Sequence, residues 1–593
     1  MRANICSSFG YQFLLSIGYV LLSIGEVRAA RAGQVLDRTV ALPSNLVAQV
    51  KRSPAPVPGD DQNPDEEPKP ADPKTTPPNN STPLDRSFFL KKIEFKCGVA
   101  NRAGCTVFKL NSPEIRSIVQ SVEGRETTLA QLQNVANKIT QLYLNKGYIT
   151  SSGSLIDQTV VNGIVVIQIS EGGIDRIQVE GNKRVNPEYI KSRIGLAQLT
   201  PLNQSKLEER LRLLRIDPLF KNVEASIRAN NVSGQSLLIV RVTEAESFKG
   251  NATIDNYSPP SVGSEQVGVN LAYTSLIGSG DRLSATYKRS TTGGASLYDF
   301  GYSIPLNPTD GNLQIRAAIN DYRITDSQFS ALNIRGKSSL YEINYRQPLV
   351  NTTTEEFALG LGFSLQDGQT FIFNQPNNFG FGPDLNGVSR TSVFKFSQEY
   401  IKRDLQGAWS ARSQFNIGTG LFGATVNSGS IPDSRFLSWT AQGQRLQQLN
   451  NNNLLIATLD AQLTTKSLLT SQQFVVGGGQ SVRGFRQNAR YGDNGLRLSI
   501  EDRITLTRNE TGSSVFQVAP FFDTGVVWNQ GDNPNNGSLP DRNFLAGAGL
   551  GLLWEPLPQL NVRLDYGLPL INLRDKGNNL QDSGLYFNVT YGF

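Results

Sequence analysis

Alternation of apolar and polar residues with a period of two dominates the chain from Phe248 to Phe593. Short alternating segments follow one another, separated by turns rich in Gly, Asn, Asp and Ser. Such alternation places every second side chain on the same face of a strand. In the segment 560–568, one face carries Val562, Leu564, Tyr566 and Leu568, and the other carries Asn561, Arg563, Asp565 and Gly567. An apolar face opposite a charged one over about nine residues is typical of a strand that crosses lipid.

About sixteen such segments are present by the alternation template. In lipid every backbone donor and acceptor must be paired, so the strands must close on themselves. A soluble β-sandwich is the alternative, but so many consecutive strands with charged faces argue against it. The sequence therefore predicts an all-β, sixteen-stranded transmembrane barrel over residues 247–593, with both ends on the side of the preceding modules. The strands are expected to begin near Asn251, Gln266, Arg282, Ser296, Asn312, Ser338, Phe357, Ser392, Ala408, Phe436, Asn453, Gly495, Val515, Phe544, Leu560 and Leu585.

Residues 1–32 have the features of a secretory signal peptide. Arg2 gives a positive start, the segment 11–24 is apolar, and Ala30-Arg31-Ala32 offers a small-residue cleavage site. An N-terminal membrane anchor is the alternative, although the apolar run is short for one. No later segment has a run of apolar residues long enough for a membrane helix.

The region that follows the signal contains little that can build a core. Residues 33–50 fit either a short amphipathic helix broken near Pro43 or a plain N-terminal tail. Residues 51–86 are dominated by proline and charge, so they are expected to form an extended linker.

Two stretches of similar organisation lie between the linker and the barrel. Residues 87–172 predict a strand at 88–95, helices at 112–124 and 128–147, and strands at 153–160 and 163–172. Residues 173–246 repeat the order strand, helix, helix, strand, strand. Two copies of one small α+β module explain this repeat, and two unrelated modules are the alternative.

Composition restricts the chemistry that the chain can perform. It has no histidine, so Ser/His/Asp and Cys/His triads and histidine metal sites are excluded. There is no G-x-x-x-x-G-K-[ST] motif, and the net charge of +6 is modest for 593 residues. We therefore expect no enzyme activity, no cofactor, no metal, no nucleotide and no nucleic-acid partner. Cys6 leaves with the signal, and the remaining Cys97 and Cys105 are expected to form a disulfide in an oxidising compartment.

One long stretch interrupts the alternation. Residues 477–495 read "GGGQSVRGFRQNARYGDNG", with Val482, Arg483, Gly484 and Phe485 in the middle. A phosphate-binding loop, a nucleic-acid contact and a structural plug are all compatible with its glycines and arginines. Downstream, Phe521, Asp523 and Gly525 share the inward face of one expected strand. A carboxylate at Asp523 then points into the lumen and needs a cation or water as a partner.

With these features assembled, the whole chain after the signal resembles the TpsB transporters of two-partner secretion. These are the haemolysin and filamentous-haemagglutinin secretion/activation proteins, within the BamA-like superfamily of barrels with POTRA modules. Three local motifs and the aromatic C-terminal end carry the resemblance: Tyr143-x-x-x-Gly147-Tyr148, Val482-Arg483-Gly484-Phe485, Phe521-x-Asp523-x-Gly525, and Tyr591 with Phe593 as a C-terminal barrel signal.

The resemblance implies a layout and a role for the loop. Residues 33–50 would be a plug helix, 51–86 a linker, 87–172 and 173–246 two POTRA modules, and 247–593 the barrel. The long loop would fold back into the barrel, where Arg483 would pair with Asp523, Gly484 would turn the chain and Phe485 would anchor the tip. An external loop with solvated arginines is the alternative.

The resemblance also implies a function. The protein would sit in the outer membrane of a Gram-negative-type bacterium, with its POTRA modules in the periplasm, and export a large unfolded exoprotein, a TpsA-like adhesin or haemolysin. Outer-membrane lipid, and the barrel assembly machinery during biogenesis, would be its other partners. Two alternatives stay open: a factor that inserts other barrels into the membrane, and a diffusion porin, which has no reason to carry the Arg483/Asp523 pair.

Overall fold

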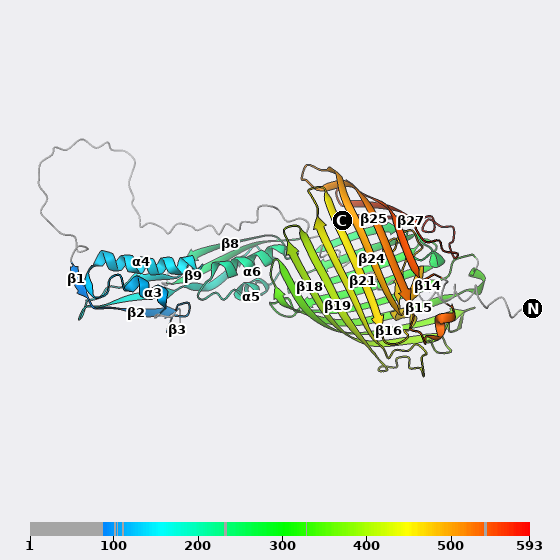
Figure 1. Cartoon of the computed structure of the whole chain (residues 1–593), viewed down its shortest axis with the longest axis horizontal. Coiled ribbons are helices and arrows are strands. Elements are labelled where there is room, and N and C mark those ends of the chain that lie inside the picture. The colour runs from blue at the N-terminus through cyan, green and yellow to red at the C-terminus, as the bar shows by residue number, and fades with distance from the viewer. Residues whose placement is uncertain are drawn as a thin grey trace, which may run out of the picture. The chain divides into compact units, whose positions relative to one another are not determined.

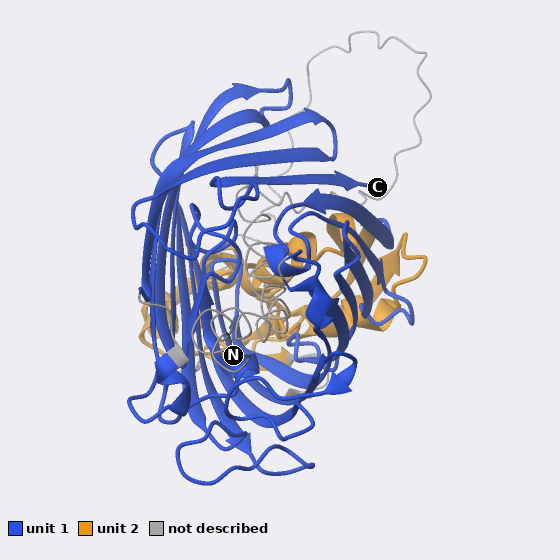
Figure 2. Cartoon of the chain, turned by 90° about the vertical axis from the view of Figure 1, so that its right-hand side faces the viewer, with its two compact units in different colours: residues 1–44, 246–593 blue, residues 45–245 orange. Residues whose placement is uncertain are grey.

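The computed structural model describes residues 87–99, 102–103, 105–108, 112–230, 234–327, 329–538 and 542–593. The expected signal peptide, plug helix and linker, residues 1–86, lie outside the described residues. The described chain belongs to two compact units, one up to Ala245 and one from Glu246 to Phe593 (Figure 2). The boundary between them falls at the start of the expected barrel.

The unit up to Ala245, which is unit 2 in Figure 2, begins with an α+β module. Its elements are β1 (Ser87–Leu90), β2 (Lys92–Val99), β3 (Arg102–Ala103), α3 (Pro113–Val119), β4 (Arg125–Thr128), α4 (Leu129–Asn145), β5 (Ser152–Leu155) and β6 (Ile164–Glu171). The strands β3, β2, β6 and β5 form one sheet in that order, with β2 parallel to β6. The apolar face of α4 packs on this sheet through Leu132, Val135 and Ile139, which are fully buried.

Two strand predictions in this module were wrong in extent. The segment 88–95 is two strands, because β1 leaves the main sheet at Lys91 and pairs with β4. The segment 153–160 is a strand only to Leu155. Beyond it, the Gln158 side chain bonds both the N–H and the C=O of Val166, at 2.7 Å each, so an amide side chain replaces the backbone ladder there.

The second module repeats the first in simpler form. It contains β7 (Gly173–Glu180), α5 (Pro187–Gly195), α6 (Gln204–Ile216), β8 (Phe220–Ala229) and β9 (Gln235–Glu244). The sheet order is β7-β9-β8, and β7 is parallel to β9 as β2 is to β6. Asn186 and Asn203 cap the two helices with their side chains, which fixes both starts. The same strand pairing in both modules supports two copies of one unit.

The unit from Glu246 to Phe593, which is unit 1 in Figure 2, is a closed antiparallel barrel of sixteen long strands (Figure 1). Pairing of β10 with β28 completes it. A two-residue piece, β17 (Gln375–Pro376), folds back and pairs antiparallel with the end of β16. Each expected strand start lies within four residues of the observed one. The strands are β10 (Phe248–Asp255), β11 (Gln266–Thr274), β12 (Arg282–Ser290), β13 (Ala295–Pro305), β14 (Asn312–Arg323), β15 (Arg335–Asn351), β16 (Glu355–Ile372), β18 (Val388–Asp404), β19 (Gly407–Thr419), β20 (Leu437–Gln448), β21 (Asn453–Thr464), β24 (Asn494–Arg508), β25 (Ser514–Trp528), β26 (Phe544–Leu557), β27 (Leu560–Pro569) and β28 (Leu585–Gly592).

The two faces of the barrel wall differ as a lipid-spanning barrel requires. On β27, Leu564, Tyr566 and Leu568 are exposed on the outside, whereas Asp565 is fully buried on the inside. Within the described residues, no helix has the length and apolar character needed to cross a membrane.

The two ends of the barrel differ in their connections. At the end where β10 begins and β28 stops, the connections are short turns, among them 352–354, 405–406 and 558–559. At the opposite end most connections are longer, and the longest is 465–493. Short periplasmic turns and long external loops are the rule for outer-membrane barrels. The chain therefore enters and leaves the barrel on its periplasmic side.

Candidate functional site: the loop inside the barrel

The connection between β21 and β24, residues 465–493, is the loop that contains the expected motif. It includes a short hairpin, β22 (Phe474–Val476) paired with β23 (Arg490–Gly492), which the sequence did not predict. Strands of three residues are too short to show a period of two, so alternation could not reveal them. We call residues 477–489, between these strands, the loop tip.

Glycine at position 484 is required by the backbone and by the wall. Its φ is +100°, in the region that residues with a side chain rarely adopt. A β-carbon there would also lie 3.0 Å from the backbone nitrogen of Pro569 on β27. The loop tip therefore turns against the barrel wall at Gly484.

Arg483 reaches from the loop tip to the inner face of β25. Its Nε and Nη2 donate to the two carboxylate oxygens of Asp523 at 2.7 and 3.0 Å, and its backbone N–H donates to the same carboxylate at 3.1 Å. Asp523 also accepts a 2.6 Å bond from the Ser499 hydroxyl. Both charged side chains are buried, Arg483 at 4% exposure and Asp523 at 0%. The loop is thus inside the barrel and its arginine is not solvated.

The pair belongs to a larger cluster that the sequence did not predict. Arg483 Nη1 also donates to Glu501 on β24 at 2.7 Å and lies 3.6 Å from Asp565 on β27. Arg563 bridges Glu501 and Asp565, and Arg503 contacts Glu501 at 2.8 Å. Three arginines and three carboxylates therefore balance one another. The period of two placed Arg563 and Asp565 on an inward face, but it could not say which strands lie next to the loop.

The Phe521 ring packs against the guanidinium group of Arg483. The Arg483 guanidinium carbon lies 3.3 Å from the centre of the Phe521 ring, a cation–π contact in a buried setting. Phe521 is buried, whereas its neighbour Phe522 is exposed on the outer face, as the alternation predicts. Phe521 and Asp523, the first and third positions of the Phe521-x-Asp523-x-Gly525 motif, therefore contact the same arginine.

Wall glycines make room for the loop tip. A β-carbon at Gly525 would lie 3.2 Å from Val482, one at Gly547 would lie 2.0 Å from the Arg483 carbonyl oxygen, and one at Gly567 would lie 2.6 Å from the Gly484 nitrogen. These glycines are on three successive strands, β25, β26 and β27. The wall is thus flat where the loop backbone lies, and a side chain at any of the three would displace it.

Phe485 and Tyr586 hold the loop tip on its other side. Phe485 is buried in an apolar cluster with Val476, Val527 and Leu545. The Tyr586 hydroxyl, on β28, accepts from the Gly484 N–H at 2.9 Å and donates to the Phe485 carbonyl at 2.6 Å. Tyr586 lies on the inward face opposite Leu585 and Phe587, so the alternation of β28 was the signal that could have indicated it.

Two further arginines of the loop bind the connection before β28. Arg486 binds Asp582 through two hydrogen bonds of 2.8 and 2.9 Å, and Arg490 binds Asp575 through two of 2.9 Å. A nucleic-acid contact was one of the roles that the sequence left open for this stretch, but these two arginines are engaged in intramolecular pairs.

Asp493 connects the two ends of the loop 465–493, which we call the root of the loop. Its carboxylate is fully buried and accepts four hydrogen bonds, from the Leu468 N–H, the Gln473 amide, the Gln530 N–H and the Asn533 amide, at 2.8–3.0 Å. No lysine or arginine of the described chain forms an ion pair with it. Two donors come from the loop and two from the next external connection, so Asp493 ties these segments together.

The module motif at Tyr143, Gly147 and Tyr148 lies at the end of α4. Gly147 has a φ of +83° just after the helix, and the rings of Tyr143 and Tyr148 meet edge to face. The buried Tyr143 hydroxyl donates to Glu171 at 2.9 Å. Burial, reinforced by this carboxylate, raises the pKa of the Tyr143 phenol, which keeps it a neutral donor. The motif is therefore a structural one within the module.

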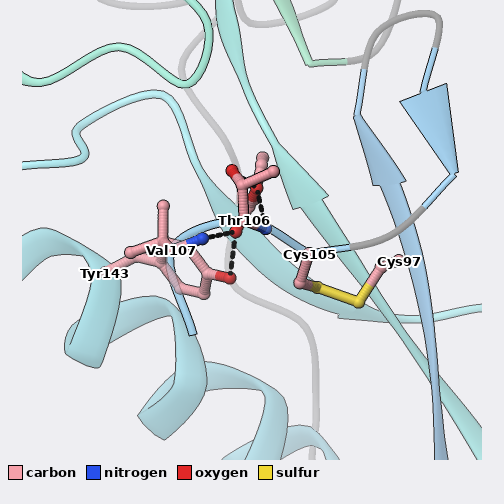
Figure 3. Close-up of a disulfide and its surroundings, with 6 residues drawn as sticks. Cys97, Cys105, Thr106, Val107 and Tyr143 are labelled. Carbon is pink, nitrogen blue, oxygen red and sulfur yellow. Dashed lines mark hydrogen bonds between the residues drawn. A yellow bond between two sulfur atoms is a disulfide. The ribbon is translucent and has the colours of Figure 1, made fainter. Parts of the chain in front are cut away.

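The expected disulfide between Cys97 and Cys105 is present (Figure 3). The residues that follow it, Thr106 and Val107, donate their N–H groups to the same Glu171 carboxylate at 2.8 Å. The disulfide thus joins β2 to a segment that is tied to α4 through Glu171.

The C-terminal aromatics lie at the seam of the barrel. The outward-facing Tyr591 and Phe593 are about half exposed, and the Phe593 N–H and C=O both bond Gly250 on β10 at 2.9 Å. The last residue thus continues the ladder that closes the barrel. Among the described residues, no group of three or more acidic or cysteine side chains is placed to hold a metal ion.

Comparison with known proteins gives consistent results. The model of the haemolysin secretion/activation protein family ShlB/FhaC/HecB matches residues 234–553, and that of the ShlB-type POTRA domain matches 101–172. The chain is 21% identical to a heme/hemopexin transporter protein, HuxB, of Haemophilus influenzae over 70% of this chain and 72% of that protein. It is 24% identical to the outer membrane transporter CdiB of Dickeya dadantii over 63% and 66%. The solved structure of CdiB from Escherichia coli superposes with a TM-score of 0.63 at 21% identity, covering 88% of this chain and 92% of that one.

Proposed function

The chain belongs to the haemolysin secretion/activation protein family, and from that membership we propose how it works. It is an outer-membrane transporter of two-partner secretion with its POTRA modules in the periplasm. The family transports partner exoproteins. Four finer points are proposals: the exported protein is unfolded, it first binds the POTRA modules, the loop tip gates the lumen, and folding outside the cell drives export.

The client enters as an extended chain and first binds the POTRA modules. Each module has strands at the edges of its sheet, β5 in the first and β8 in the second, with backbone groups that another strand can pair with. Addition of a client strand to such an edge, or docking in a groove between a helix and a strand, supplies affinity without a fixed sequence. Unfolded adhesins or haemolysins fit this mode because they present backbone along their length.

The loop tip gates the lumen. The observation that carries this proposal is the arrangement around Arg483: a buried arginine with carboxylates on three wall strands, over a wall flattened by glycine. Such a fit gives the loop tip one defined position on the inner wall. We call the wall residues that hold it the seat: Glu501, Asp523, Gly525, Gly547, Asp565, Gly567 and Tyr586. When the tip leaves, Arg563 and Arg503 still neutralise part of the wall charge, so the seat remains available for return.

Transport needs no chemical step in this chain. The sequence contains no P-loop motif. Folding of the exoprotein outside the cell supplies the direction, because a folded client cannot re-enter. We propose accordingly that the protein is a conduit and not an enzyme.

We propose two further roles, one for the N-terminal segment and one for the C-terminal aromatic residues. Residues 33–50 plug the resting pore, and single-channel conductance after their deletion tests this; unchanged conductance counts against a plug. Tyr591 and Phe593 present the new barrel to the barrel assembly machinery, and bilayer lipid then surrounds its apolar outer face.

Deletion of the gene, followed by comparison of secreted and outer-membrane proteins, tests the function. Loss of one large exoprotein with an unchanged set of outer-membrane barrels is the expected result. Broad loss of barrels would instead favour the assembly factor. Loss of small-solute uptake with normal secretion would favour the porin.

A further inference from the structure

A cluster of basic side chains stands on the outer, lipid-facing side of the barrel at its external end. It consists of Arg323 at the end of β14 and Arg335 and Lys337 at the start of β15, and we call it the rim cluster. The chain neighbours of these cations, Tyr322 on β14 and Gly336 and Ser338 on β15, are buried on the inner side. The period of two therefore directs all three cations outward.

The cations of the rim cluster are uncompensated. Arg323 is the direct cross-strand partner of Arg335, and like charges in such pairs destabilise a sheet. Within the part of the chain that the structure describes, none of the three side chains forms an ion pair. Two carboxylates share this outer face: Asp321, the cross-strand partner of Lys337, and Asp367 on β16, which is paired with Arg390. Among the described residues, neither reaches ion-pair distance of the three cations.

Arg335 also lacks a hydrogen-bond partner for one of its guanidinium nitrogens. Its guanidinium carbon lies 4.9 Å from the centre of the Phe371 ring on β16, and the Lys337 ammonium lies 5.9 Å from it. The Arg335 Nε is buried against this surface and has no hydrogen-bond partner. The ring holds the two cations in place while their charge stays unsatisfied.

Exposed apolar side chains lie directly below the rim cluster on the same outer face. Ile319 on β14 and Tyr341 and Ile343 on β15 face outward and are exposed. A molecule that covers both surfaces must carry anionic groups joined to hydrocarbon chains. The height of the cluster, at the end of the strands away from the chain termini, places it in the polar zone of the outer leaflet.

We propose that the rim cluster is a binding site for an outer-leaflet glycolipid that carries phosphate groups, with its acyl chains on the apolar surface below. Arginine forks match phosphate oxygens, and one bound phosphate between Arg323 and Arg335 removes their repulsion. Side chains two residues apart on one strand are about 7 Å apart, so Lys337 contacts a second anionic group of the same headgroup. The proposal rests on the outer-membrane location and not on the export path.

Binding of bisphosphoryl lipid A and of dephosphorylated lipid A to the full-length protein in detergent tests this site. We expect the phosphorylated lipid to bind the unaltered protein roughly a hundredfold more tightly, from about fivefold for each cation beside an anionic headgroup. The variant Arg323→Gln/Arg335→Gln/Lys337→Gln should lose that preference. The control Lys249→Gln/Lys402→Gln/Lys466→Gln removes the same charge from exposed lysines elsewhere on the barrel and should keep it.

A second variant protects the test against misfolding. Asp321→Asn removes the carboxylate directly opposite Lys337, so it should tighten binding of the phosphorylated lipid severalfold, which a damaged barrel would not do. Equal binding of both lipids to the unaltered protein, or an unchanged preference in the triple variant, would overturn the proposal. Competition by inorganic phosphate as effective as that by the lipid would also overturn it, because the site would then bind free anions. Failure of binding would leave the export function untouched.

Discussion

Asp523 on β25 lies directly opposite Gly547 on β26 in the register of the barrel. The carboxylate holds the Arg483 side chain, and the missing side chain at Gly547 admits the Arg483 carbonyl, to which a β-carbon would come within 2.0 Å. One cross-strand pair thus combines the electrostatic and the steric parts of the seat. The two parts can be separated by mutation.

The steric part is tested by Gly547→Ala. A methyl group there meets backbone and not a flexible side chain, so the loop tip must move off the wall although every charge is retained. We expect higher and noisier single-channel conductance in planar bilayers, with the barrel still inserted. Gly443→Ala on β20 is the matched control, because a β-carbon there meets nothing within 4 Å. Identical conductance of the two variants would contradict the proposed fit.

The electrostatic part is tested by Arg483→Ala. Truncation leaves Asp523 and Glu501 without a shared cation, and breaking a buried pair in this way costs about 3–5 kcal/mol. That cost falls on the seated loop, because the sixteen-stranded ladder does not depend on it. Secretion of the exoprotein should fall sharply while the amount of barrel in the outer membrane stays unchanged. Arg483→Lys should restore little, since lysine cannot bind Asp523 through a fork. Normal secretion by the alanine variant would refute a role for the pair.

The barrel was predictable from sequence because each of its strands shows the alternation of apolar and polar residues within its own few residues. A strand in lipid has an apolar face and a polar face, and that requirement repeats in every segment, as β27 and β28 show. Element ends were less predictable where a side chain replaces the backbone ladder, as Gln158 does after β5. Alternation cannot detect such a substitution.

The site was predictable only in part, for a related reason. The alternation of β25 put Asp523 on the inner face, and resemblance to a family supplied Arg483 as its partner. Glu501, Arg563, Asp565 and Tyr586 were not predicted as members, because their meeting depends on which wall strands the loop touches. The rim cluster was missed for the same reason, since its cations become neighbours only through the β14–β15 register.

The root of the loop is tested by Asp493→Asn. An amide has one acceptor oxygen in place of two, so its NH₂ group faces two of the four donors and leaves them unpaired. Each unpaired buried donor destabilises the closed base of the loop by about 1–3 kcal/mol. We expect faster amide hydrogen exchange in residues 466–493 and 529–538. Asp532→Asn is the control, because that exposed carboxylate lies in the connection of Gln530 and Asn533 and accepts one bond, from Ser430. Unchanged exchange in the Asp493 variant would show that the root does not depend on the carboxylate.

The disulfide is tested by Cys97→Ser/Cys105→Ser. Closing a loop of this length stabilises a domain by about 2–3 kcal/mol in the chain-entropy model. Its loss also frees Thr106 and Val107, so the Glu171 carboxylate loses donors. Limited proteolysis of the full-length protein should therefore cleave faster within residues 87–172. Reductant should reproduce this effect in the unaltered protein and add nothing in the variant; equal cleavage rates throughout would refute it.

The last contact of the seat is tested by Tyr586→Phe. The hydroxyl both accepts from Gly484 and donates to the Phe485 carbonyl, so its removal leaves two buried backbone groups unpaired without changing packing or charge. We expect the loop tip to lose about 1–3 kcal/mol of stability in its seat, which raises open-channel conductance less than Arg483→Ala does. Tyr591→Phe on the same strand is the control, because Tyr591 is half exposed on the outer face. Conductance equal to that of the unaltered protein would show that Arg483 and Phe485 hold the tip without β28, and that the seat is confined to β24–β27.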